Sequence, residues 1–301
     1  MPGPDASPTT AHSGAAADSR SLSRGQLLLV LAALGFSLAG FFTRQAPVNL
    51  WAMVFWRDVF GSAALVPFII VFEGAGAWRS VVRIGWWGWA MIAASSLGTI
   101  LYLGAFAHTS VANVSIIYAS APLMTAFIAW AWLGEKPARK TLAAAVLALL
   151  GVAITVSGSV GGAIFGDCLA LAMTVAFSLM TVLTRRHAGL PVLLTSCIAS
   201  LVAALAVVPL GWAAGASFVI PWPAMAWLAA FGIVAMAIAL PCYLIGAAQV
   251  PAGQTMLISA LEMPLAPLWV WLAFAEQPSI ASVTGGAVVG LAILWQLSWL
   301  P

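Results

Sequence analysis

The sequence contains very little charge. Only 6% of its 301 residues are Asp, Glu, Lys or Arg, whereas 63% are hydrophobic. A soluble domain carries about a quarter charged residues, so this chain cannot cover a surface that faces water. The net charge of +3 is therefore not a sign of nucleic-acid binding. The lipid bilayer is the expected partner instead.

Residues that carry catalysis and metal binding are also scarce. The chain has three His and three Cys. Cys168, Cys197 and Cys242 lie in apolar stretches and have no metal-ligand spacing. The sequence has no HExxH, GxSxG or P-loop motif. We therefore expect no enzyme activity, no catalytic residue, no metal and no cofactor.

Long hydrophobic runs, in contrast, are abundant. About 20 apolar residues are needed to cross the hydrocarbon core of a bilayer, and runs this continuous do not suit the strands of a barrel. Residues 1–24, rich in Ala, Ser, Pro and Thr, are expected to form a disordered cytoplasmic tail. The sequence predicts an all-α integral membrane protein with ten spans, near residues 26–43, 50–72, 85–107, 110–133, 141–158, 164–184, 189–211, 223–246, 252–274 and 279–299.

The two halves of the chain repeat each other at a constant offset. Leu133-Gly134-Glu135-Lys136-Pro137 ends one apolar run, and Phe274-Ala275-Glu276-Gln277-Pro278 ends another; 276 minus 135 gives 141. Phe36-Ser37-Leu38 recurs as Phe177-Ser178-Leu179 at the same offset. A constant offset across separate segments predicts structural repeats. We expect two repeats of five helices each, over residues 25–158 and 159–301.

Positive charge is distributed unevenly between the expected loops. Cytoplasmic loops of membrane proteins are enriched in Lys and Arg. With the N-terminus inside, Arg44 lies on the opposite side and Arg57 within a span, whereas the cytoplasmic segments hold Arg20, Arg24, Arg79, Arg83, Lys136, Arg139, Lys140, Arg185 and Arg186. This bias predicts an inner-membrane protein with both termini in the cytoplasm. Because each repeat has an odd number of helices, the second repeat is expected to be inverted relative to the first.

Several motifs resemble a known family. The pattern Ala107 to Ala112, Pro122, Leu133 to Pro137 and Gly151-Val152 resembles the EamA module of the drug/metabolite transporter superfamily. The stretch from Gly246 to Pro278 resembles a diverged second module, with Phe-Ala-Glu in place of Leu-Gly-Glu and an uncharged hinge. The resemblance implies an exporter or exchanger of small metabolites, amino acids among them.

Ionisable side chains inside spans are costly and are functional candidates. Glu262 lies about ten residues into the ninth expected span, near the midplane. It either contacts a substrate amine or a coupled proton, or it is a structural carboxylate bound between helices, with Arg57 as one partner. Arg57 either binds a substrate carboxylate or ties helices together, and we favour the structural role. Arg57 and Asp58 point about 100° apart on a helix and need not pair.

Hydroxyl and aromatic side chains complete the expected site. Ser95, Thr99 and Tyr102 are spaced by four and three residues and so share one helix face. The expected substrate contacts are Glu262, Tyr102, Thr99, Ser95, Asn113, Ser115, Tyr118, Gln254, Ser259, Ser37 and Ser178. Prolines inside spans remove backbone hydrogen-bond donors. We interpret four of them as structural or gating positions rather than as tolerated kinks: Pro122, Pro241, Pro264 and Pro267. Arg57 is assigned to the same structural group.

These features together predict a secondary transporter that works by alternating access through a central cavity between inverted repeats. Neutral or aromatic amino acids are the expected small-molecule substrates, largely because of the resemblance. An exporter of cationic or hydrophobic drugs and a non-transporting structural membrane protein are the alternatives. The last span contains a GxxxG, Gly286 to Gly290, which permits close helix contact within a monomer or in a homodimer.

Overall fold

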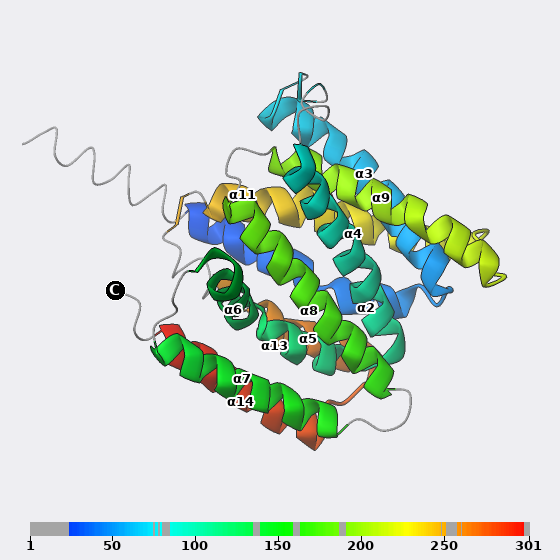
Figure 1. Cartoon of the computed structure of the whole chain (residues 1–301). Helices are drawn as coiled ribbons and strands as arrows, with labels where there is room; N and C mark the ends of the chain where they lie inside the picture. The colour runs from blue at the N-terminus through cyan, green and yellow to red at the C-terminus, as the bar shows by residue number, and fades with distance from the viewer. Residues whose placement is uncertain are drawn as a thin grey trace, which may run out of the picture.

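The computed structural model describes residues 24–74, 76–77, 79, 85–134, 139–158, 163–186, 191–247, 249–250, 258–259 and 261–297. These residues are almost entirely helical and include no strand (Figure 1). Seven helices in these ranges are long and apolar enough to cross a membrane: Arg24–Gln45, Leu50–Phe72, Gly85–His108, Val111–Trp132, Ala163–Leu183, Val192–Ala213 and Trp222–Ala247. Three shorter apolar helices, Val146–Ser157, Pro264–Phe274 and Ile280–Ala292, fall in the fifth, ninth and tenth expected spans.

Side-chain caps set the starts of two of these helices. At α3 (Leu50–Phe72), Oδ1 of Asn49 accepts a 2.9 Å hydrogen bond from the Ala52 N–H. After α4 (Gly85–His108), Oγ of Ser110 accepts a 3.1 Å bond from the Asn113 N–H at the start of α5 (Val111–Ala119). Such caps satisfy N–H groups that have no partner inside the helix. Both starts lie within one residue of the expected positions.

The fourth expected span is broken in the middle. α5 ends at Ala119, and α6 (Ala121–Leu133) begins after Ser120 with Pro122 in its first turn. Hydroxyl groups bind the carbonyls at the break: Ser120 donates to the Ile117 oxygen (2.7 Å), and Ser178 of α8 (Ala163–Arg186) donates to the Ala121 oxygen (3.2 Å). The break therefore lies at Ser120, and Pro122 occupies a position where its missing N–H costs little.

A second half-helix has the same dimensions. α13 (Glu262–Phe274) and α6 are both 13 residues long, and α13 begins and ends 141 residues after α6. Each ends in a left-handed residue, Gly134 with φ 69° and Ala275 with φ 55°. The offset seen in the sequence is thus reproduced in backbone conformation, although only one of the two caps is a glycine.

Replacement of Ala275 by Gly is expected to raise the free energy of unfolding by about 1 kcal/mol, because a left-handed conformation strains a residue with a Cβ but not glycine. Gly134→Ala is the matched reverse change. Among the described residues, no atom lies within 4 Å of a Cβ built at Gly134, so we attribute its expected loss of about 1 kcal/mol to backbone strain. Thermal unfolding in detergent checks both; equal melting temperatures for all three proteins would contradict the argument.

The eighth expected span contains a wide turn. It is made of α10 (Trp222–Gly232), a π-helix, η2 (Ile233–Ala239), and α11 (Leu240–Ala247). A Cβ at Gly232 would collide with the Arg57 carbonyl oxygen and lie 2.6 Å from the Gly61 nitrogen. The backbones of α10 and α3 therefore touch beside Arg57. π-turns inside helices are frequent at functional sites.

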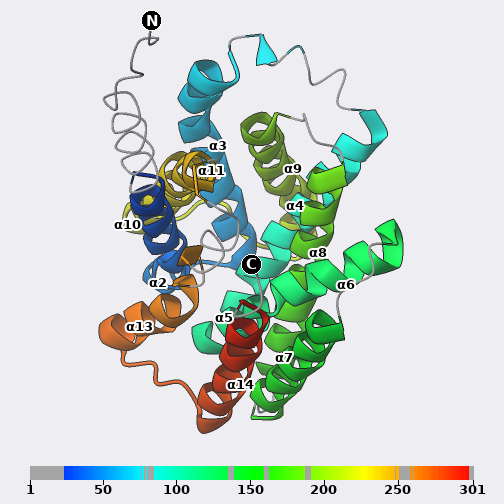
Figure 2. The ribbon, with the colours of Figure 1, turned by 90° about the vertical axis from the view of Figure 1, so that its left-hand side faces the viewer.

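α7 (Arg139–Ser157) and α14 (Ile280–Leu297) lie side by side at one edge of the bundle (Figures 1 and 2). A Cβ at Gly285 would lie 2.5 Å from the Gly151 oxygen and would collide with Thr155. The expected GxxxG does not make this contact: Gly286 faces Ile116 of α5, and nothing described lies within 4 Å of a Cβ at Gly290. The close approach thus uses Gly285 and lies within one chain.

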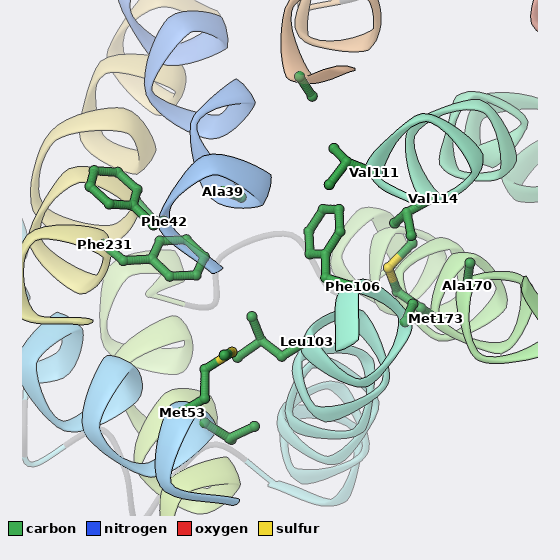
Figure 3. Packing of buried hydrophobic residues seen from close by; sticks show 14 of the residues in the cluster. Ala39, Phe42, Met53, Leu103, Phe106, Val111, Val114, Ala170, Met173 and Phe231 are labelled. Atoms are coloured by element: carbon green, nitrogen blue, oxygen red, sulfur yellow. The ribbon is translucent and has the colours of Figure 1, made fainter. Parts of the chain in front are cut away.

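The other main pairs are α4 with α8 and α3 with α9 (Val192–Ala213). A buried apolar cluster joins these helices to α2 (Ala39–Gln45), which continues the helix over 24–37. In Figure 3 the rings of Phe42 and Phe231 lie together, with centroids 5.6 Å apart, and Met173 lies beside Val114. This cluster packs α2, α3, α4, α8 and α9 against one another.

Hydrogen bonds join helices and connecting segments at two ends of the bundle. At one end, which we call the Arg44 end, Asn49 donates to the Ser217 oxygen and Trp56 to the Phe218 oxygen, both at 2.8 Å. At the other, the Glu73 end, the Glu73 carboxylate accepts bonds from the first N–H groups of α9, at Leu193 (2.8 Å) and Leu194 (3.0 Å). Connected helices thus run between two opposite faces.

Candidate functional site

Glu262 is the first residue of the half-helix α13 and is half-buried. The N-terminal end of a helix favours negative charge because its N–H groups point outward. The Glu262 carboxylate is within electrostatic range of the hydroxyls of Tyr102 on α4 and Tyr118 on α5. The structure therefore brings together three of the expected substrate contacts from three different helices.

Phe177 of α8 lies between the two tyrosines. Its ring centroid is 6.5 Å from that of Tyr102 and 6.1 Å from that of Tyr118. A Cβ at Gly98 of α4 would lie 2.6 Å from this ring, so a glycine is needed for α4 to approach it. Phe177 was not among the expected site residues, although it directly precedes Ser178 in the repeated Phe-Ser-Leu.

Arg57 and Asp58 form an ion pair through Nη1 and Oδ1. Both are buried, with 6% and 0% exposure, and Arg57 also lies over the Phe231 ring, 5.0 Å from its centroid. The spacing of neighbouring helix positions does not require this pair, and the structure shows that it forms. The reason is burial: two charges removed from water are stable only if each finds a counter-charge, and the long Arg side chain can turn back to its neighbour.

Arg57 is also close to the tyrosine site. It is within electrostatic range of the Tyr102 hydroxyl, but in the described ranges no ion pair joins it to Glu262. Nε of Arg57 and Oδ2 of Asp58 are buried without a hydrogen-bond partner among the described residues. The ion pair thus leaves one donor and one acceptor unused.

The expected hydroxyl residues divide between this site and helix contacts. Ser37 accepts a 2.9 Å bond from the Trp269 Nε1–H of α13, and Ser115 donates to the Val111 oxygen. Ser178 binds at the α5–α6 break, as described above. Thr99 is buried, and Ser95 lines a small cleft with Met180 and Thr195 between α4, α8 and α9. Ser259 is half-buried three residues before Glu262, and Gln254 lies outside the described residues.

The prolines occupy different kinds of position. Pro264, which is exposed, lies in the first turn of α13, and Pro122, which is half-buried, lies in the first turn of α6. Pro267 lies inside α13, and Pro241 is buried in α11 directly after the π-helix. Pro241 and Pro267 therefore interrupt hydrogen bonding within a helix, whereas the other two only mark where a half-helix starts.

Asn113, an expected substrate contact, is bound by other polar side chains. Its Nδ2 donates to Oδ1 of Asp167 (3.0 Å), which also accepts from Thr109 Oγ1 (2.7 Å). Its Oδ1 accepts a bond from Ser282 of α14. Asp167 is 1% exposed and was not among the expected residues. The available signal was an acidic residue near the start of the sixth apolar run.

Comparison with known proteins supports the two-unit organisation. A family model described as the EamA-like transporter family matches residues 23–157 and 164–297. No curated protein matches the chain. A solved structure titled "Crystal structure of protein" has 21% sequence identity and a TM-score of 0.63, and the alignment covers 91% of this chain and 96% of that one. The similarity to this solved structure shows a similar fold. The family model covers most of the chain, and the protein therefore belongs to the EamA-like transporter family.

Proposed function

We propose that this membrane transporter exports small amine-bearing metabolites, with neutral or aromatic amino acids as the substrates, by alternating access. The observation that carries the proposal is the position of Glu262 at the start of a half-helix, within electrostatic range of the Tyr102 and Tyr118 hydroxyls. Discontinuous helices of this kind provide substrate and ion sites in many transporters. Aromatic rings beside the carboxylate suit an ammonium group and an apolar side chain.

The charge balance of the interior supports an amine-bearing substrate. Arg57 and Asp58 neutralise each other, and the carboxylate of Asp167 is bound by Thr109 and Asn113 away from the tyrosines. Glu262 is then the carboxylate beside the tyrosines for which the described residues show no ion pair. A charge in the low-dielectric interior requires a counter-charge. Either a proton or a substrate ammonium can supply it, and the two would compete for one carboxylate. This competition would couple export of an amine to movement of a proton in the opposite direction.

Several features support ten spans in two inverted repeats. α3 packs on α9, and α7 packs on α14; each pair joins helices that are equivalent in the 141-residue register. Exposed Arg24, Arg79 and Arg186 lie beside the Glu73 end of the described chain, which supports a cytoplasmic Glu73 end. The Arg44 end is then extracytoplasmic, and both termini are cytoplasmic.

Flux into proteoliposomes tests this function. Purified protein is assayed with labelled neutral, aromatic and acidic amino acids and one cationic dye, with and without a pH gradient. We expect saturable flux of neutral or aromatic amino acids that increases when protons can move in the opposite direction. Flux of the dye without flux of any amino acid would favour the drug alternative, in which Glu262 binds the cation. No flux from protein with a cooperative thermal transition would overturn the proposal.

A further inference from the structure

Arg44, at the end of α2, forms an ion pair with Glu276, which follows α13. Nε lies 3.0 Å from Oε2, and Nη2 lies 3.4 Å from Oε1. Two contacts between a planar guanidinium and a carboxylate fix both groups in orientation. The side chains remain 27% and 29% exposed, so water reaches this pair.

The same two side chains also hold the turn between α4 and α5. Arg44 donates from Nη1 to the Phe106 oxygen (2.7 Å) and from Nη2 to the Thr109 oxygen (3.1 Å). Glu276 Oε1 accepts from the Val111 N–H (3.3 Å). A cation thus meets carbonyls at and just after the end of α4, and an anion meets the first N–H group of α5. Arg44 thus joins α2 to this turn, Glu276 joins the end of α13 to it, and the ion pair links the two attachments directly.

A buried network fixes the other side of the turn. Thr109 and Asn113 both bind Asp167, as described above. A Cβ at Gly166 would lie 2.6 Å from the His108 carbonyl carbon, so α8 touches the turn directly. The turn therefore has one contact that is buried and one that is exposed to water.

We propose that the Arg44–Glu276 ion pair is a gate that closes the substrate path between α5 and α13 at the Arg44 end, and that it breaks and re-forms in each transport cycle. A shallow hollow between these helices lies beside the pair and is lined by Val111, Pro267, Val270 and Glu276. A partly exposed ion pair contributes little net stability and can break, whereas the buried Asp167 network keeps α5 on α8. This gate rests on the proposed function, because it assumes a path that leads to Glu262.

Side-specific labelling tests the gate. Native Cys168, Cys197 and Cys242 are replaced by Ala, and Ser115→Cys places a reporter on α5, three residues before Tyr118. A membrane-impermeant maleimide is added to either face of oriented vesicles, and the ratio of the two labelling rates is measured. Glu276→Gln is expected to increase the rate from the Arg44 end about tenfold and to lower it from the Glu73 end. Arg44→Gln should shift the ratio in the same direction.

Asp167→Asn is the matched control, because it removes the charge of a carboxylate on α8 that contacts the same turn. It is expected to lower the melting temperature and leave the ratio unchanged. An unchanged ratio in both Glu276→Gln and Arg44→Gln, or equal increases from both faces, would overturn the gate, since equal increases indicate loosening only. A shifted ratio supports the gate even if no substrate is transported; that combination would instead refute the proposed substrates.

Discussion

Glu262→Gln is expected to lower the initial rate of transport on the order of 100-fold, because the proposed contact between its carboxylate and a substrate ammonium would be lost, and loss of one partner of such a charge pair typically costs about 2–5 kcal/mol. The amide is nearly the same size as the carboxylate, so the Tyr102 and Tyr118 helices should remain packed. What disappears is the negative charge that we propose binds a proton or an ammonium group. The residual flux should also lose its dependence on the pH gradient. Initial rates in proteoliposomes, measured at several external pH values, check both effects.

Glu73→Gln is the matched control for this experiment. The same replacement of a carboxylate by an amide is made at the Glu73 end of the bundle, where the Glu73 carboxylate caps the first N–H groups of α9. Its replacement should cost about 1 kcal/mol of stability and leave the pH dependence of flux intact. If Glu262→Gln retained both its rate and its pH dependence, Glu262 would be a structural carboxylate.

Gly285→Ala is expected to destabilise the protein by about 1–3 kcal/mol, the usual cost of an added group in a filled contact. The new methyl would meet the backbone of Gly151 and the side chain of Thr155 on α7. α7 and α14 would have to move apart along their shared length. Thermal unfolding of the purified protein in detergent measures the loss.

Gly290→Ala provides the comparison on the same helix. No described atom lies within 4 Å of the added Cβ, and Ala favours a helix over Gly by about 1 kcal/mol. This change should therefore be neutral or stabilising. A larger loss at Gly290 than at Gly285, together with a change in oligomeric state, would show that the GxxxG packs against a second copy rather than lying free.

The sequence predicted the helices better than the contacts between them. The bounds of α3 match because Asn49, a strong cap, directly precedes an unbroken apolar run. The 141-residue offset was visible because Gly134-Glu135 and Ala275-Glu276 keep the same spacing. Hydrophobic length and repeated turns are local signals, and local signals can be read from one chain.

Tertiary pairs could not be read in this way. Arg44 and Glu276 are 232 residues apart, and each looks like an ordinary loop charge until the fold brings them together. The Arg57–Asp58 pair was missed because helix spacing gives only the direction in which each side chain leaves the backbone. The position of the charged group at the end of a long side chain depends on burial as well. The π-helix at Ile233–Ala239 has no signal of its own, because an apolar run reads the same in an α-helix and in a wider turn.

The equivalence of α6 and α13 also bears on which way the empty transporter faces. At about 1.5 Å per residue each half-helix is about 20 Å long, and both have the same left-handed end. In the proposed mechanism, two identical units would make the inward-facing and outward-facing states equal in free energy. A preference of the empty protein for one of the two states must then arise where the units differ. Glu262 in the second unit is equivalent to Ala121 in the first, and Ala275 is equivalent to Gly134. The carboxylate that we propose to bind the substrate would thus also bias the orientation of the unloaded protein.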